Sequence, residues 1–247
     1  MSKMKIYSVG LSAFLVLFGG CASRPTSLPP ATSAPGVESH PRLSAAQILR
    51  AAAAEPARPF EGQGWQRMGN SNDLAGWRET AFAGRGEVQC EHGLVLLNIG
   101  DPFTGINWTQ EFPRTNYEVG LDAMRVLGSD FFCGLTVPVG DSFCSLIVGG
   151  WGGGLVGISS IDGLDASEND TTKYMNFENG RWYRIRLRVT EKRIEAWIDG
   201  NEVINTDITG KRISLRPGDI ELSKPFGLAA WETTAALRNI QMRRVGE

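Results

Sequence analysis

One predicted strand carries charged residues whose types and spacing could do chemistry. In "NYEVGLDAMRV", alternation between two faces places Glu118 and Asp122 on one face and Arg125 with the apolar residues on the other. A pair of carboxylates can act as acid and nucleophile on a glycosidic bond. A charge on an apolar face needs a partner, such as Asp130 or Glu118. The catalytic candidates are therefore Glu118, Arg125 and Asp130; a structural ion pair is the alternative role of Arg125.

A glycine-rich stretch further along the chain surrounds a single tryptophan. In "LIVGGWGGGLVG", the neighbours of Trp151 have no side chains to bury it. We therefore expect Trp151 to be more exposed than Trp108 and Trp231, the other candidates for stacking on a sugar ring. Filling of the core is the alternative role of each tryptophan. The glycines also fit a G-x-G-x-x-G pattern, but "LVGISSI" predicts a strand where a dinucleotide site needs a helix. They therefore indicate a bulge or close packing.

An acidic loop follows the glycines. Asp162, Asp165 and Glu168 offer oxygen ligands to a divalent metal such as Ca²⁺, although their spacing is not that of a helix-loop-helix calcium loop. A solvated polar turn is the alternative interpretation. We expect this loop to lie beside Trp151 at the open edge of a sheet.

The N-terminus predicts export. Lys3 and Lys5 precede an apolar segment that is short for a membrane span and ends in small residues before Cys21. Residues 1–20 are therefore predicted to be a signal peptide. The small residues before the cysteine resemble a bacterial lipobox, in which that cysteine is lipidated. We expect an exported lipoprotein, anchored to a membrane and located in the periplasm or at the outer membrane or cell surface. A signal cleaved near "CAS" without lipidation is the alternative.

The segment that follows the signal is predicted to be a tether. Residues 21–59 are rich in proline, serine and alanine, which favours an extended linker. Within it, "SAAQILRAAAAEPA" predicts a short helix capped by Ser44.

The remaining cysteines suggest one disulfide. An exported compartment is oxidising, and Cys133 and Cys144 flank "GLTVPVGDSF", a predicted hairpin. We expect these two to pair and Cys90 to remain a thiol. A turn centred on Gly140-Asp141 would not place the pair directly opposite, so the register stays open.

From residue 60 onward the patterns predict strands. "RWYRIRLRV", "RIEAWIDG" and "NEVINTDI" form a meander in which apolar and polar side chains alternate, and Asp199-Gly200 is a strong hairpin signal. Many short antiparallel strands over residues 60–247 predict an all-β, two-sheet antiparallel jelly-roll sandwich. The formal charge of -2, without a basic block, argues against nucleic acid as a partner.

Several blocks together carry a family resemblance. The segments "DLAGW", "YEVGLDAMRVLGSDFFCGL", "GRWYRIRLRVTEKRIEAWIDGNEVIN" and "GLAAWETTAALRNIQMR" resemble the 3-keto-disaccharide hydrolase domain family, within the concanavalin-like lectin and glucanase sandwiches. The resemblance spans about residues 64 to 245. It implies a curved sheet that faces sugars and cleavage of glycosides oxidised at C3. The strand at Glu118 lacks the third acid of the related glucanase strands, which disfavours glucanase chemistry.

These observations predict a membrane-anchored, carbohydrate-active domain, and the family resemblance implies that it hydrolyses or eliminates 3-keto-glycosides. The alternatives are a non-catalytic carbohydrate-binding or envelope interaction module and a structural envelope lipoprotein. The predicted partners are carbohydrate and, through the N-terminal lipid, a membrane. A divalent metal such as Ca²⁺ is the one cofactor that the sequence suggests.

Overall fold

A computed structural model describes residues 43–70 and 72–246. The predicted signal peptide, Cys21 and most of the tether lie outside the described residues. Residues Arg42–Glu247 form one compact unit. Within the part of the chain that the structure describes, no helix has the length and apolar character needed to cross a membrane.

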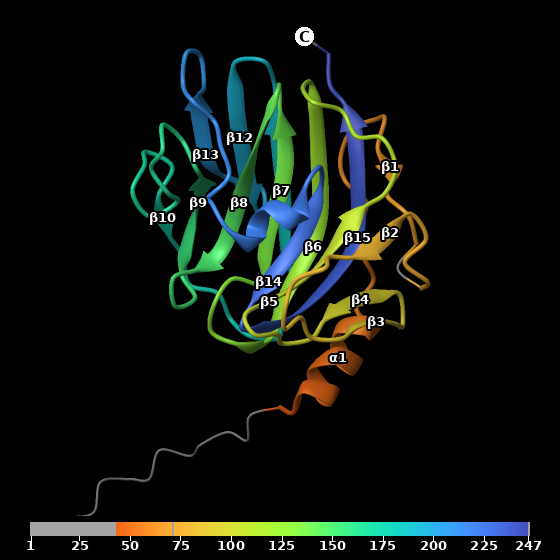
Figure 1. The fold of residues 1–247 in the computed structure, drawn as a ribbon. Helices are drawn as coiled ribbons and strands as arrows, with labels where there is room; N and C mark the ends of the chain where they lie inside the picture. The colour runs from red at the N-terminus through yellow and green to blue at the C-terminus, as the bar shows by residue number, and fades with distance from the viewer. Residues whose placement is uncertain (1–42, 71, 247) are drawn as a thin grey trace, which may run out of the picture. The chain divides into compact units, whose positions relative to one another are not determined.

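The unit is a two-sheet antiparallel jelly-roll sandwich, as predicted (Figure 1). Sheet A has the strand order β13 (Asn201–Asp207), β12 (Arg193–Ile198), β11 (Tyr183–Val189), β6 (Tyr117–Gly128), β15 (Thr233–Arg244), β4 (Leu94–Leu97) and β3 (Val88–Glu91), and β1 (Gln66–Arg67) pairs with β15. Sheet B has the order β10 (Lys173–Tyr174), β9 (Leu155–Ser159), β8 (Ser142–Gly150), β7 (Cys133–Val139), β14 (Gly227–Trp231), β5 (Phe103–Trp108) and β2 (Trp77–Glu79).

Alternation along the strands fills the space between the sheets. In β11, Ile185 and Leu187 are buried in the main core, whereas Arg184 and Arg186 point to the outer face. The predicted hairpin at Asp199-Gly200 joins β12 to β13, and both residues have positive φ, as a type I′ turn requires. The meander predicted from the sequence is confirmed.

The outer face of sheet A is covered by the N-terminal segment. The helix α1 (Ala45–Ala54) begins at the predicted cap, where the Ser44 hydroxyl accepts from the Gln47 N–H at 3.3 Å in a capping box. Ala52 of α1 is buried with Met124, Val126 and other apolar residues of sheet A. The helix is therefore part of the folded unit.

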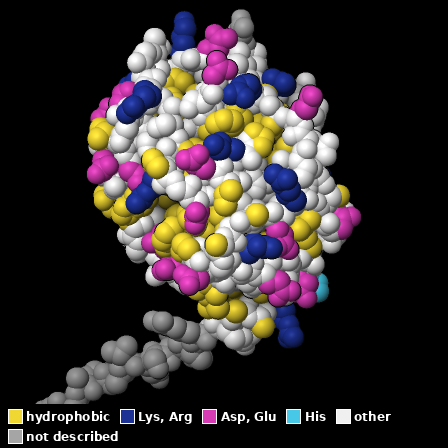
Figure 2. All heavy atoms as spheres, in the orientation of Figure 1, with side chains coloured by type: hydrophobic (Ala, Val, Ile, Leu, Met, Phe, Trp, Pro, Cys, Tyr) yellow, Lys and Arg dark blue, Asp and Glu magenta, His cyan; other side chains and the backbone are white. Residues whose placement is uncertain are grey.

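The outer face of sheet B is covered as well. The 3₁₀ helix η1 (Asp219–Ser223) lies in front of β7, β8 and β14 in Figure 1. Its Ile220 packs with Phe103, Phe131 and Ile147 in a second apolar cluster. Figure 2 shows acidic and basic side chains interspersed over this face of the molecule.

Candidate functional site

Trp151 lies in the turn that joins β8 to β9. It is 44% exposed and is the most exposed tryptophan among the described residues, as the glycines around it predicted. The N–H groups of Gly153 and Gly154 both donate to the Gly150 carbonyl at 3.2 Å, which closes a tight turn. The φ of Trp151 is 49°, in the left-handed region that bulky residues rarely adopt. The register shift between Val148 and Gly150 is the predicted bulge.

Asp130 and Arg125 hold this turn from the protein side. The Asp130 carboxylate accepts from the Gly152 N–H at 3.0 Å, and Arg125 Nη1 donates to the Gly153 carbonyl at 3.2 Å. Arg125 Nη2 donates to the Phe177 carbonyl at 2.5 Å. Burial lowers the pKa of the Arg125 guanidinium, and nearby Tyr183 and Asp130 oppose that shift. Two of the catalytic candidates therefore position the Trp151 turn.

A second exposed aromatic side chain lies at the same end of sheet B. Tyr174 of β10 is 75% exposed, and it pairs with Leu155 of β9, which in turn pairs with Gly150 beside Trp151. The sequence did not point to Tyr174, because a two-residue strand carries too short a pattern to predict. We call these two exposed side chains, Trp151 and Tyr174, the aromatic surface.

The other two tryptophan candidates are mostly packed. Trp108 contacts Trp77 edge-on, with ring centroids 5.1 Å apart. It is partly buried and packs against the main core. Trp231 packs edge-on against Phe103, with centroids 4.6 Å apart. Trp108 and Trp231 therefore contribute to the packed interior, which was the alternative role of each tryptophan, whereas Trp151 does not.

Glu118 and Asp122 lie on the outer face of sheet A. Arg125, on the same strand, points inward to the Trp151 turn, so the two carboxylates lie away from that turn. Glu118 is fully buried and Asp122 is 3% exposed. Each carboxylate is paired with arginines: Glu118 with Arg186, Arg188 and Arg243, and Asp122 with Arg184 and Arg238. The structure thus separates Glu118 from Arg125 and Asp130, and the predicted catalytic set is not assembled.

The N-terminal segment before β1 packs on this charged face of sheet A. Arg184 donates to the Pro59 carbonyl at 2.9 Å and stacks on the ring of Phe60, 4.5 Å from its centroid. Arg243 stacks on Trp65 at 4.7 Å. Because Arg184 also pairs with Asp122 and Arg243 with Glu118, these contacts fasten the segment to sheet A through the arginines.

The acidic loop does not lie where we expected. It follows the end of β9 opposite to the Trp151 turn, and β9 is five residues long. Asp162 accepts from the Arg212 N–H at 2.8 Å, and Asp165 accepts from the hydroxyl of Ser159 and pairs with Arg216 at 2.9 Å.

The acids do not meet as a metal site either. Glu168 accepts from the Asp165 N–H at 3.2 Å. Across residues 43–70 and 72–246, no three metal-ligating side chains converge. The predicted set of Asp162, Asp165 and Glu168 is therefore corrected to a loop whose carboxylates bind the protein itself.

The predicted disulfide is also wrong. The hairpin turn is at Gly140-Asp141, so Cys144 pairs with Val137 and Cys133 pairs with Val148. The offset of four residues separates the two cysteines by about 13 Å along the strands, at roughly 3.3 Å per residue, whereas disulfides need Cα atoms within about 7 Å. Cys90, Cys133 and Cys144 are all free thiols.

Comparisons with solved structures return sandwiches of low sequence identity. A candidate glycosyl hydrolase from Parabacteroides distasonis aligns with a TM-score of 0.48 and 14% identity, over 74% of this chain and 95% of that one. A carbohydrate-binding module from Bacillus subtilis aligns with a TM-score of 0.45 and 15% identity, over 69% and 97% of the two chains.

The family comparison covers most of the sandwich. No curated protein matches the chain. Residues 64–243, from just before β1 to the end of β15, match the 3-keto-alpha-glucoside-1,2-lyase-like domain. This match agrees with the resemblance in the sequence blocks and with the all-β sandwich. The chain belongs to this family of carbohydrate-active domains.

Proposed function

We propose that this protein is an exported carbohydrate-binding domain that holds sugars on the aromatic surface formed by Trp151 and Tyr174. The observation that carries the proposal is an exposed tryptophan fixed in a left-handed turn by Asp130 and Arg125. Aromatic faces bind the apolar faces of sugar rings, and a backbone turn that is already fixed loses little entropy when a ligand binds. The fixed turn therefore supports recognition more directly than it supports catalysis.

Cleavage of 3-keto-glycosides is the second candidate function. Membership of the 3-keto-alpha-glucoside-1,2-lyase-like family favours it. The carboxylates of Glu118 and Asp122 are held by arginines, and that of Asp130 accepts from two backbone N–H groups. Each of the three carboxylates is thus engaged within the protein, and we rank binding above cleavage.

One experiment separates the two functions. The purified protein is incubated with 3-keto-trehalose, with and without Ca²⁺, and also applied to a glycan array. We expect glycan binding without release of sugar, and Trp151→Ala should weaken that binding at least about five-fold, the equivalent of one aromatic contact of roughly 1 kcal/mol. Release of sugar by the wild-type protein would establish the enzyme instead. Binding unaffected by Trp151→Ala would remove the aromatic surface from the proposal.

We also propose that Cys21 is lipidated and anchors the domain to a membrane. The basic and apolar residues before Cys21 support this proposal, and one or more acyl chains would provide the anchoring free energy. Cys21→Ser should move the protein from the membrane fraction to the soluble exported fraction. Unchanged partitioning would exclude lipidation at this position.

A further inference from the structure

Exposed apolar side chains gather at one end of the sandwich. In the part of the chain that the structure describes, seven large apolar side chains are exposed. Two of them, Leu164 and Leu222, lie in the loop after β9 and in η1. The other five lie at the end of the sandwich where β6 and β8 finish, and we call them the apolar end: Leu43, Ile99, Leu127, Trp151 and Tyr174.

Backbone contacts join three strands at the apolar end. The loop after Leu127 reaches the turn between β8 and β9, where the Asp130 carboxylate accepts from the Gly152 N–H at 3.0 Å. Thr234 pairs with Leu127 across the ladder of β15 and β6, and its hydroxyl accepts from the Ile99 N–H at 3.2 Å. Ile99 and Leu127 therefore flank Thr234, next to the turn that carries the exposed tryptophan.

The N-terminal helix lies at the same end. Ile48 of α1 packs beside Gly180, where an added Cβ would lie 3.4 Å from it. The Gly180 N–H donates to the Arg125 carbonyl at 2.8 Å, and the Arg125 side chain holds the turn that carries Trp151. Leu43, which is 59% exposed, comes directly before the Ser44 cap of α1. The chain therefore enters the folded unit at the apolar end (Figure 1).

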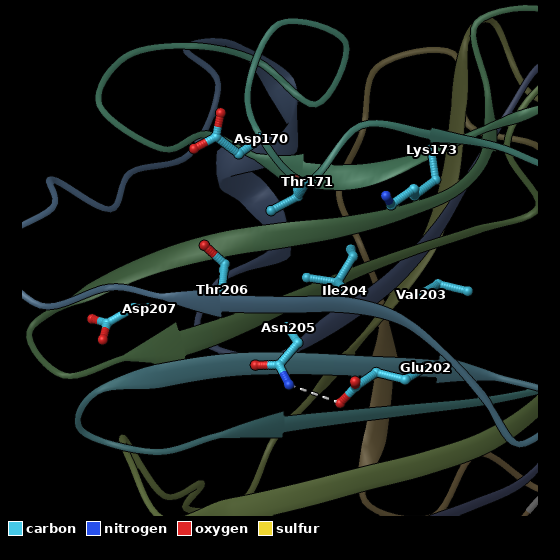
Figure 3. Close-up of a pocket in the computed structure, with 9 residues that line it drawn as sticks. All are labelled: Asp170, Thr171, Lys173, Glu202, Val203, Ile204, Asn205, Thr206 and Asp207. Atoms are coloured by element: carbon cyan, nitrogen blue, oxygen red, sulfur yellow. Dashed lines mark hydrogen bonds between the residues drawn. The ribbon is translucent and has the colours of Figure 1, made fainter.

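The opposite end and the open edge of the sandwich are polar by comparison. Asp141, in the turn between β7 and β8, and Glu191 and Lys192, in the turn between β11 and β12, are exposed. Figure 3 shows the hollow between β10 and β13, in which Asn205 donates to Glu202 at 3.0 Å. Exposed apolar surface is thus concentrated where the chain enters the unit.

Side chains of these types suit the surface of a lipid bilayer. Tryptophan and tyrosine are enriched at the level of the lipid headgroups, and aliphatic side chains bind the acyl boundary beneath them. Residues 22–42 separate Leu43 from Cys21, the cysteine that we propose to be lipidated, and can span at most about 75 Å when fully extended. That length keeps the domain near the membrane but does not fix its orientation. An apolar surface at the point of entry can fix it.

We propose that the apolar end docks on the bilayer to which Cys21 is attached. Leu43, Ile99 and Leu127 contact the acyl boundary, and the aromatic surface lies at the level of the headgroups, where it also meets sugars at the membrane surface. Docking adds to the anchor, because a single acyl chain binds a membrane only reversibly. The choice of partner rests on the proposed lipidation of Cys21, but the contact itself needs no acyl chain.

The test therefore uses the full chain with Cys21→Ser, purified and mixed with vesicles of phosphatidylethanolamine and phosphatidylglycerol. Sedimentation of the vesicles measures the bound fraction against lipid concentration. We expect this protein to bind, and Ile99→Ser together with Leu127→Ser to weaken binding about ten-fold, because two aliphatic side chains no longer leave water. Leu164→Ser together with Leu222→Ser is the matched control: these leucines are similarly exposed but lie outside the apolar end, so binding should not change.

The outcomes separate this proposal from the others. Both double variants should keep the thermal midpoint of the Cys21→Ser protein, because the changed side chains are exposed. A Cys21→Ser protein that does not bind vesicles overturns docking, and leaves lipidation and sugar recognition to their own tests. Equal weakening in the two double variants overturns the location.

A second copy of the chain is the remaining occupant of the apolar end, and gel filtration tests it. We expect the Cys21→Ser protein to elute as a monomer. A dimer that Ile99→Ser together with Leu127→Ser dissociates would overturn the bilayer as the partner. Glycan binding should persist in that double variant, because neither residue belongs to the aromatic surface.

Discussion

Arg243 Nη2 donates to Glu118 Oε2 at 2.7 Å, although 125 residues separate the two in sequence. Arg243 lies near the C-terminus on β15, and Glu118 lies on the neighbouring strand β6. Because Arg243 also stacks on Trp65, this ion pair fastens the N-terminal segment to sheet A. A fully buried carboxylate can persist only with such partners.

Glu118→Gln should therefore lower the free energy of unfolding by about 3 kcal/mol, since it leaves three partly buried arginines without the counterion that they share. Urea denaturation followed by circular dichroism measures the change. Glu87→Gln, at an exposed carboxylate, is the matched control and should change stability little. An unchanged urea midpoint in Glu118→Gln would contradict the fastening role.

Two tryptophans should respond in opposite ways to truncation. Trp231→Ala should lower the free energy of unfolding by about 3 kcal/mol, because the ring packs against Phe103 and its loss leaves a cavity. Trp151→Ala should leave the thermal midpoint nearly unchanged, because its ring is exposed. Thermal melts of both variants test this difference. A larger loss in Trp151→Ala would show that its ring supports the fold.

The turn that presents Trp151 should be sensitive at Gly153. A Cβ there would lie 2.8 Å from both Arg125 Nη1 and the Ser129 carbonyl, at a φ of 110°. Gly153→Ala should cost about 1–3 kcal/mol of stability and weaken glycan binding. Gly152→Ala is the matched control, since its φ is also positive but its Cβ would meet no atom within 4 Å. Equal effects of the two variants would mean that the contact with Arg125 is unimportant.

The buried thiols should be protected and should make stability depend on pH. Burial raises the pKa of Cys133 and of Cys144 from 9.0 to about 12. Because each folded pKa exceeds the unfolded value, the unfolded state loses its protons first as the pH rises. The stability contributed by both thiols is present below about pH 9 and is lost as the pH rises toward 12.

Urea midpoints measured from pH 7 to pH 10.5 should therefore fall at the alkaline end (~pH 9 and above). Iodoacetamide at neutral pH should label both thiols only after unfolding, as mass spectrometry of the peptides would show. A disulfide-linked peptide that contains Cys133 and Cys144 would contradict the observed register.

Removal of divalent metal should leave the fold unaffected. Asp162 and Asp165 already accept hydrogen bonds from Arg212, Ser159 and Arg216. The thermal midpoint should therefore be the same in EDTA and in Ca²⁺, because a ligand stabilises only a state that binds it. A clear rise in Ca²⁺ that Asp165→Asn abolishes would restore the metal interpretation.

The sequence by itself determined the local structure and the fold class. Alternation in β11, the Asp199-Gly200 turn and the Ser44 cap each act within a few residues, so they are visible in the order of amino acids. The glycines around Trp151 predicted its exposure for the same reason, since neighbours without side chains cannot cover a ring.

Only the tertiary structure decided which distant residues meet. Glu118 and Arg125 share one strand, but the pleat sends them to opposite faces: Glu118 meets arginines of β11 and β15, and Arg125 meets the Trp151 turn. The register of β7 on β8 kept Cys133 from Cys144, and the length of β9 separated the acidic loop from Trp151. Strand register and sheet order bring together residues far apart in sequence, and no local pattern encodes those pairings.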